Sequence, residues 1–234
     1  MKSSYDDLQI NKLAEFWKAH GDAILNYGLI PVPTIETGVA SNTLRALGKY
    51  IRRGWKKKPS VIFNEWAIRK NVFTEIIPDK NSYERFHDDL VYSLEKHWKD
   101  KAGHKLRRYP YAAKMVDLHV KHILWRPNCF LGQESAKLRF DVKDREDLIQ
   151  FVFQPLDRYS LIALKAFGVS TVDVGESQRN IPKTTKSAPT MGFVDSREIY
   201  SQLQDHIRRI CEEAAVPTFA FDYHAWNVRN PEVE

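Results

Sequence analysis

Apolar residues recur at three- and four-residue spacing in one segment after another, whereas the alternation typical of a half-buried strand is nearly absent. Side chains at that spacing share one face of an α-helix, so each segment gains one apolar face. In the clearest case, residues 82–99, the spacing predicts a buried stripe of Tyr83, Phe86, Leu90, Leu94 and Trp98. The chain is therefore predicted to be all-α.

The same reasoning divides the rest of the chain. Further helices are predicted over 10–27, 60–73, 110–124, 156–167, 199–214 and 221–228, with another one capped by Ser41 or Asn42. Gly103 and Pro110 predict a hairpin between two helices. Asp195 followed by Glu198 predicts a capping box. Residues 144–153 are helical or extended, and 169–190, rich in Gly, Pro, Ser, Thr and Asn, are predicted to form a long surface loop.

Length and composition limit the organisation. A chain of 234 residues suits one helical domain, which could contain two lobes of about 38–125 and of 1–37 with 126–234. The two cysteines, Cys129 and Cys211, have no metal-ligand spacing, so we expect a reducing, cytoplasmic setting, no metal and no cofactor. Neither a signal peptide nor a membrane-length apolar run is found, so we expect an intact monomer without a membrane partner.

The formal net charge of +6 makes a polyanion such as DNA a reasonable partner. Basic residues gather in two runs, at 49–58 and at 96–108, each beside a glycine. From these runs and the helix that follows, the candidate DNA-binding residues are Arg52, Arg53, Lys56, Lys57, Lys101, Gly103, Lys105, Arg108 and Lys114. The simpler interpretation is that both runs are solvated helix ends.

Asp157 is the acidic residue most worth a chemical hypothesis. It follows Pro155 at the start of an apolar helix, where an aspartate ordinarily caps the helix N-terminus. If its carboxylate faced a cleft lined by Lys and Arg, it could instead stabilise a developing cation or position a water molecule. The residues alone leave both interpretations open.

Several segments, taken in order, resemble the second half of the archaeal 8-oxoguanine DNA glycosylases, a divergent branch of the helix-hairpin-helix DNA glycosylase superfamily. The matching pieces are Ala113-Lys114-Met115-Val116-Asp117-Leu118, Gln154-Pro155-Leu156-Asp157-Arg158-Tyr159, the helix from Ile199 to Ala214, and Ala214-Ala215-Val216-Pro217 through Asp222 and Trp226. The resemblance covers roughly Leu94 to Trp226. It implies a fold of two helical lobes around a cleft.

The resemblance also implies a reaction. Members of this family flip a damaged base out of double-stranded DNA, and an aspartate that maps onto Asp157 assists cleavage of the bond between base and sugar. Their nucleophilic lysine maps onto Arg107, which stays protonated and cannot form a Schiff base, although it would lie near the abasic sugar. Either Lys105 takes that role through a shift in register, or the enzyme is monofunctional and uses Asp157 and water. We favour the monofunctional reaction.

The identity of the excised base stays open, because the first ninety residues match the family only as helices. By analogy, a base bulkier than 8-oxoguanine is conceivable, including the hypermodified bases of phage DNA against which some prokaryotic glycosylases defend. Two other hypotheses compete with the glycosylase. One is a non-catalytic DNA-binding protein that retains the fold, and the other is a helical protein-interaction module.

Overall fold

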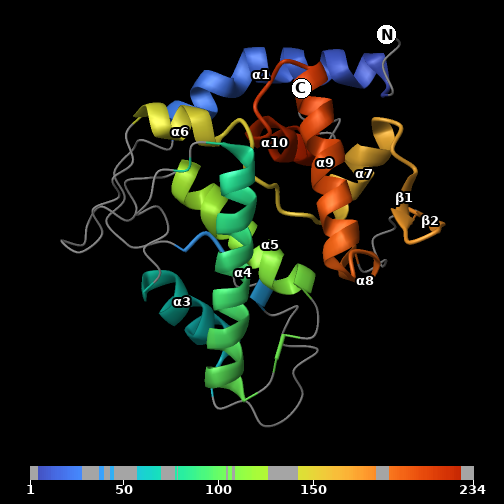
Figure 1. Cartoon of the computed structure of the whole chain (residues 1–234). Helices are drawn as coiled ribbons and strands as arrows, with labels where there is room; N and C mark the ends of the chain where they lie inside the picture. The colour runs from blue at the N-terminus through green and yellow to red at the C-terminus, as the bar shows by residue number, and fades with distance from the viewer. Residues whose placement is uncertain are drawn as a thin grey trace. The chain divides into compact units, whose positions relative to one another are not determined.

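The computed structural model describes residues 5–27, 37–39, 43–44, 57–69, 77, 79–103, 105–106, 109–125, 142–182 and 190–227. Within them the chain is mostly helical, with one two-stranded sheet (Figure 1). The chain divides into two compact units. We call Leu25–Leu148 the middle unit, and Met1–Ile24 with Ile149–Glu234 the terminal unit. The middle unit extends further at both ends than the lobe of about 38–125 suggested by the sequence.

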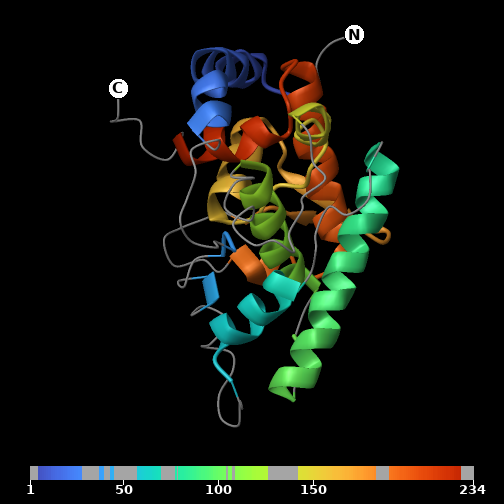
Figure 2. The same cartoon turned by 90° about the vertical axis from the view of Figure 1, so that its left-hand side faces the viewer.

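The middle unit contains the two helices predicted on either side of Gly103, which are confirmed. Its helices are α3 (Pro59–Arg69), α4 (Lys80–Ala102), α5 (Tyr109–Trp125) and α6 (Val142–Leu148). The side chain of Asp79 caps α4 by accepting the backbone N–H of Ser82 at 2.8 Å, and α4 ends at Gly103. Helix α4 packs against α3 and α5, and Figure 2 shows α3 beside the C-terminal half of α4.

The apolar stripe of α4 is buried as predicted, with one exception. Tyr83, Leu90, Leu94 and Trp98 are buried, whereas Phe86 is only half-buried and the neighbouring His87 is completely buried. The Nε2 atom of His87 lies 2.8 Å from Oδ1 of Asp117 on α5, and both side chains are 0% exposed. A buried polar group needs such a partner, and the partner here comes from a different helix.

Arg145 on α6 joins the C-terminal ends of two other helices. Its Nε donates to the carbonyl oxygen of Leu124 at 2.6 Å, and its Nη2 donates to the carbonyl oxygen of Leu25 at 2.9 Å. The last carbonyls of a helix lack partners within the helix, so a cation placed there satisfies them and complements the helix dipole. Arg145 therefore anchors α6 within the middle unit.

Gly38 sits where the chain passes very close to α5. The carbonyl oxygen of Thr37 accepts a hydrogen bond of 2.9 Å from Nδ1 of His119. A Cβ atom added to Gly38 would lie 2.2 Å from Cβ of His122 and 2.8 Å from the carbonyl oxygen of Leu118. Gly38 also has a φ of 73°, which other residues rarely adopt. Only glycine fits this position without displacing the helix.

We therefore expect Gly38→Ala to lower the free energy of unfolding by about 3 kcal/mol, because it combines backbone strain with a collision. Urea unfolding measures the loss. Gly103→Ala is the matched control: Gly103 has a φ of 77° but nothing within 4 Å of an added Cβ. The control should lose only about 1 kcal/mol. Equal losses in the two variants would contradict the collision.

The terminal unit holds the remaining elements. They are α1 (Asp7–Tyr27, whose last turn belongs to the middle unit), α7 (Arg158–Ala166), β1 (Thr171–Val174), β2 (Ser177–Asn180), α8 (Thr190–Phe193), α9 (Arg197–Glu213) and α10 (Phe219–Asn227). Helix α10 packs against α7 and α9. The helices predicted over 10–27, 156–167, 199–214 and 221–228 are confirmed within two residues at most boundaries. None of the described helices has the length and apolar character needed to cross a membrane.

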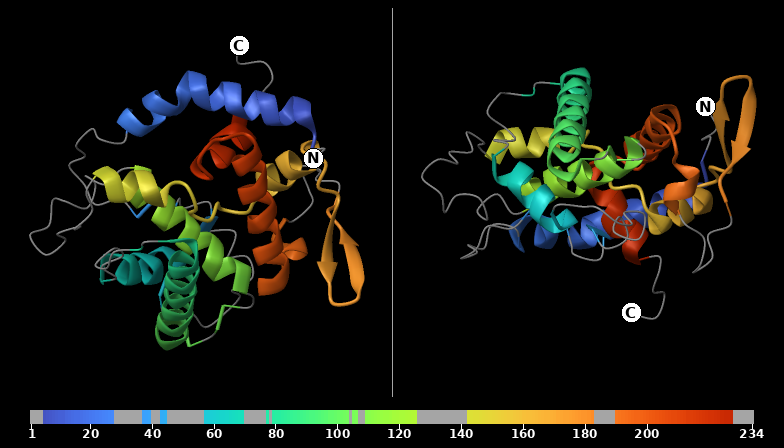
Figure 3. Two further views of the ribbon diagram at one scale, coloured as in Figure 1. Left: turned by 45° about the horizontal axis from the view of Figure 1, so that its top comes forward. Right: turned by 90° about the horizontal axis from the view of Figure 1, so that it is seen from below.

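The predicted loop over 169–190 was wrong for residues 171–180, which form an antiparallel hairpin of β1 and β2. Gly175 occupies the two-residue turn with a φ of 59°, a conformation that suits tight hairpins. Figure 3 shows the hairpin beside α9, where Gln202 bonds both backbone groups of Asp173, accepting from its N–H at 2.7 Å and donating to its carbonyl oxygen at 2.6 Å. Strands this short leave almost no periodicity in the sequence.

The capping box predicted at Asp195 was also wrong. Ser196 caps α9 instead, because its Oγ accepts the backbone N–H of Ile199 at 3.2 Å. Asp195 accepts a hydrogen bond of 2.9 Å from Nη1 of Arg179 on β2. Asp195 therefore binds a side chain of the hairpin, and the hydroxyl of Ser196 caps α9.

Two buried histidines make folding pH-dependent. Burial lowers the pKa of both His119 and His224 from 6.5 to about 4. Unfolding lets these side chains bind protons below pH 6.5, so their contribution to stability is complete above that value and falls as the pH drops towards 4. We expect each to reduce the free energy of unfolding by up to about 1.4 kcal/mol per pH unit in this window. His224→Phe should flatten the slope measured by urea unfolding, and an unchanged slope would contradict this assignment.

Candidate functional site

The two candidate catalytic residues that the structure describes belong to different units. Asp157 belongs to the terminal unit, whereas Lys105 belongs to the middle unit. Arg107 lies outside the described residues, as do the candidate DNA-binding residues Arg52, Arg53, Lys56 and Arg108. Asp157 and its neighbours within the terminal unit form one candidate site.

Asp157 is the N-cap of α7, as expected for an aspartate at that position. Its Oδ1 accepts the backbone N–H groups of Tyr159 at 2.7 Å and of Ser160 at 3.1 Å. Ser160 completes a capping box, because its Oγ accepts the backbone N–H of Asp157 at 3.3 Å. The side chain of Asp157 is half-buried. These bonds fix the carboxylate at the positive end of the helix dipole, where negative charge is favoured.

The extended segment that leads to Asp157 is fixed by side chains from α9 and the chain before α10. Gln204 uses its amide to bond both backbone groups of Gln154: its Oε1 accepts the N–H at 3.0 Å, and its Nε2 donates to the carbonyl oxygen at 2.7 Å. The hydroxyl of Thr218 donates towards the carbonyl oxygens of Ile149, at 3.2 Å, and Val152, at 2.9 Å. All these bonds are buried, so they satisfy a backbone that has no sheet partner.

An aromatic and cationic surface adjoins the carboxylate in the sequence. Arg158 lies over the ring of Tyr159, with 4.8 Å from Cζ to the ring centroid, and its Nη2 donates to the Tyr159 hydroxyl at 2.7 Å. The ring of Tyr159 lies 4.6 Å from that of Trp226 on α10, which is 45% exposed. We call Arg158, Tyr159 and Trp226 the aromatic corner. Tyr159 is half-buried, and the exposed ring of Trp226 beside it is a surface on which a nucleic-acid base can stack.

The sequence interpretation missed this corner. It treated the aromatic residues around Asp222 as core, which holds for Phe219 and Phe221, both 0% exposed. Trp226 differs because it lies in the last turn of α10, at the edge of the unit's core. Trp226 follows Tyr223 by three residues, and this helical spacing does not indicate that Trp226 is exposed. The ring that Trp226 contacts, Tyr159, belongs to another helix.

The described basic residues of the middle unit have different environments. Lys57 pairs with Glu65, with 2.6 Å between Nζ and Oε1, and this hydrogen bond lowers the pKa of the Glu65 carboxyl. Lys101 and Lys114 are half-buried, and Lys105 is exposed. Gly103 is the C-cap of α4, with its backbone N–H donated to the carbonyl oxygen of Lys99 at 2.9 Å.

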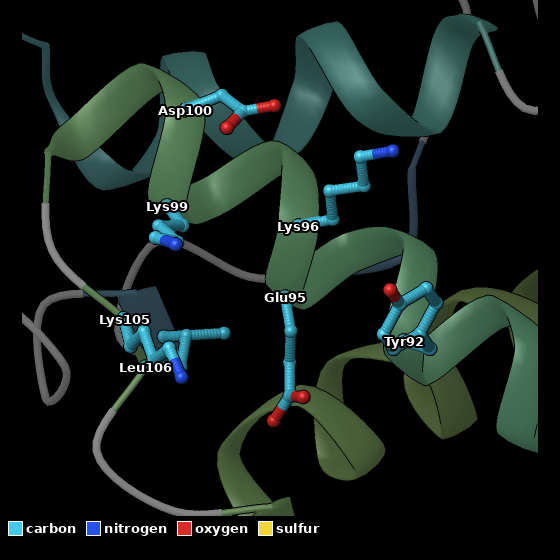
Figure 4. A pocket seen from close by; sticks show the side chains of 7 residues that line it. All are labelled: Tyr92, Glu95, Lys96, Lys99, Asp100, Lys105 and Leu106. Atoms are coloured by element: carbon cyan, nitrogen blue, oxygen red, sulfur yellow. The ribbon is translucent and has the colours of Figure 1, made fainter.

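Lys105 lines a pocket of about 370 Å³ on the C-terminal half of α4 and the segment that follows it. The lining residues are Tyr92, Glu95, Lys96, Lys99, Asp100, Lys105 and Leu106, which Figure 4 shows together. Asp157 is not among them. The pocket belongs to the middle unit, whereas the capped aspartate belongs to the terminal unit.

Comparison of the chain with protein-family models, with curated proteins and with solved structures found no match. The case for a function consequently depends on the arrangement of the residues. Within the described part of the chain, no three His, Cys, Asp or Glu side chains are grouped so that they could hold a metal ion. The chemical groups on hand are a capped carboxylate, an aromatic corner and a set of lysines.

Proposed function

We propose that the protein is a DNA glycosylase that removes a damaged or modified base from double-stranded DNA, with a helix-hairpin-helix glycosylase-like fold. The observation that carries the proposal is the carboxylate of Asp157, held at the N-terminus of α7 with the aromatic corner next to it in the chain. Base removal needs a fixed negative charge, because the sugar becomes oxocarbenium-like as the base departs. It also needs a surface that accepts an unstacked base.

The fixed position of Asp157 supports this role. A carboxylate that accepts two backbone N–H groups needs little rearrangement when charge develops beside it, which is the condition for electrostatic stabilisation. The bonds from Gln204 and Thr218 hold the preceding backbone in place. The geometry is equally suitable for orienting a water molecule towards the sugar.

We further propose that the reaction is monofunctional hydrolysis. The bond between C1′ of the sugar and the base nitrogen breaks, the base leaves with a proton, and the oxygen of water attaches to C1′ to give an intact abasic site. Asp157 stabilises the cationic sugar and accepts the proton of the attacking water, then releases this proton to solvent, from which the departing base takes one. Arg107 occupies the place of the lysine nucleophile in the sequence resemblance, and an arginine cannot form the Schiff base of a lyase.

The activity is tested by incubating the protein with duplexes that carry 8-oxoguanine or hypermodified pyrimidines, followed by alkali, which cleaves the strand at abasic sites. We expect alkali-dependent cleavage of at least one modified duplex and none of the unmodified control. If every duplex stays intact and the protein binds DNA in a salt-sensitive way, the result would favour a DNA-binding protein without catalysis.

Borohydride trapping separates hydrolysis from lyase chemistry. We expect no covalent protein–DNA adduct, and we expect Lys105→Ala to keep base excision within about twofold of the unmodified protein, because water rather than an amine attacks the sugar. An adduct that disappears in Lys105→Ala would show that Lys105 is the nucleophile.

The alternative is a DNA-binding protein without catalysis, and one observation favours it. The Oδ1 atom of Asp157 is engaged by the backbone of α7, so the aspartate already has a structural role. This alternative predicts binding that weakens with salt and no abasic product on any duplex.

A further inference from the structure

The pocket on α4 brings together aromatic and charged side chains from two segments of the middle unit. Tyr92, Glu95, Lys96 and Lys99 are spaced three and four residues apart, so they share one face of the helix. Lys105 and Leu106 reach the same space from the segment beyond Gly103. The volume of about 370 Å³ lies within the range of ligand pockets, roughly 300–1,000 Å³.

The charges of the pocket favour an anion. Three lysines and two acids line it, and among the described residues none of Lys96, Lys99 and Lys105 forms an ion pair. Two other lysines of this unit, Lys57 and Lys80, are paired with glutamates. The ammonium groups at the pocket are therefore available to a ligand, and lysine is a common phosphate-binding residue in proteins.

The remaining residues add an organic part to the ligand. In Figure 4, Lys99, Lys105 and Leu106 lie on one side of Glu95 and Tyr92 lies on the other. The ring of Tyr92 is 69% exposed and offers a flat face, on which a base can stack. Burial raises the pKa of Glu95, an effect that Lys105 opposes. A partly desolvated carboxyl group forms strong hydrogen bonds with hydroxyl or N–H groups of a ligand.

We propose that this pocket binds a nucleoside monophosphate unit, with the base against Tyr92, the sugar hydroxyl or base N–H groups bonded to Glu95, and the phosphate bound by Lys99 and Lys105. The unit is either a free nucleotide or the terminal residue of a strand, which present the same chemical groups. The site lies wholly in the middle unit and does not include Asp157. The proposed nucleotide binding and the proposed base excision can therefore be tested, and can fail, separately.

The test is calorimetric titration of the full chain with five probes: adenosine 5′-monophosphate, adenosine, inorganic phosphate, a short single-stranded oligonucleotide with a 5′-phosphate, and the same oligonucleotide without it. We expect the monophosphate or the 5′-phosphorylated strand to bind at least tenfold more tightly than adenosine or phosphate alone. If the monophosphate binds, the natural ligand is a free nucleotide. If only the phosphorylated strand binds, the ligand is the end of a strand.

Variants locate the binding. Lys99→Ala and Lys105→Ala should each weaken binding of the tighter probe at least tenfold, whereas Lys80→Ala should change it less than twofold, because Lys80 lies on the same helix but does not line the pocket. Glu95→Gln should weaken that probe several-fold without weakening inorganic phosphate. Circular dichroism confirms that each variant is folded. No binding of any probe, equal binding of phosphate and monophosphate, or an equal loss in Lys80→Ala would overturn the proposal.

Discussion

Replacing Asp157 with asparagine is expected to slow base excision by a factor of about 10² to 10⁴, measured in single turnover on whichever duplex the protein cleaves. Asparagine is nearly isosteric with aspartate and caps helices equally well, so its amide oxygen can still accept the N–H groups of Tyr159 and Ser160. The substitution removes the negative charge and keeps the geometry. The free energy of unfolding should therefore change by less than about 0.5 kcal/mol.

Asp79→Asn is the matched control for this substitution. Asp79 caps α4 as Asp157 caps α7, and it accepts the backbone N–H of Ser82 at 2.8 Å. Both variants should retain stability, and only Asp157→Asn should lose excision. If Asp157→Asn excises bases at the normal rate, the carboxylate is a helix cap and nothing more. If both variants lose activity together with stability, the effect is one of folding.

The largest expected loss of stability follows from Asp117→Ala, which should lower the free energy of unfolding by about 3 to 5 kcal/mol in urea. The variant removes the oxygen that lies 2.8 Å from Nε2 of His87, inside an interface where both side chains are 0% exposed. The histidine loses this partner in a place that water cannot reach. A small cavity adds to the loss.

A double variant distinguishes the lost bond from the cavity. His87→Leu combined with Asp117→Ala removes both members of the pair, so neither side chain is left buried without the other. We expect the double variant to recover at least 1 kcal/mol relative to Asp117→Ala alone. Additive losses, with no recovery, would mean that the pair contributes only packing.

Helix periodicity predicted α4 and α5 well because both bury one apolar face against a neighbour. It could not predict which residue of the pair Phe86 and His87 turns inward, since an apolar pattern selects phenylalanine. The choice depends on Asp117, thirty positions away on another helix. The pairing of two buried polar residues depends on how their helices pack against each other. The sequence of either helix alone does not indicate it.

The predictions for the hairpin segment and for the cap of α9 were wrong for a different reason. Four-residue strands give two inward positions at most, so alternation in Thr171–Val174 cannot be told from chance. Asp195 and Ser196 are both good capping residues, and Asp195 is drawn away by Arg179 on β2. The failure to predict the strand thus also produced the failure to predict the cap.

At the candidate site, the role of Asp157 as a helix cap follows from local sequence, because capping residues act within three positions. The bonds that hold Gln154 do not, since Gln204 lies fifty residues further along the chain. The same holds for the contact of Tyr159 with Trp226. Sequence could therefore name the carboxylate but not the surface beside it.

The attachment of β1 to α9 has a consequence for how the protein behaves at high concentration. An exposed strand edge with unpaired N–H and carbonyl groups is a template for strand addition by another molecule, and hence for aggregation. At Asp173 both backbone groups are already occupied by the amide of Gln202. The opposite strand, β2, has the sequence Ser-Gln-Arg-Asn, which is polar and carries a cation. Gln202 of α9 thus takes the hydrogen bonds at Asp173 that an added strand would need on the β1 edge. The polar and charged side chains of β2 disfavour strand addition at the other edge.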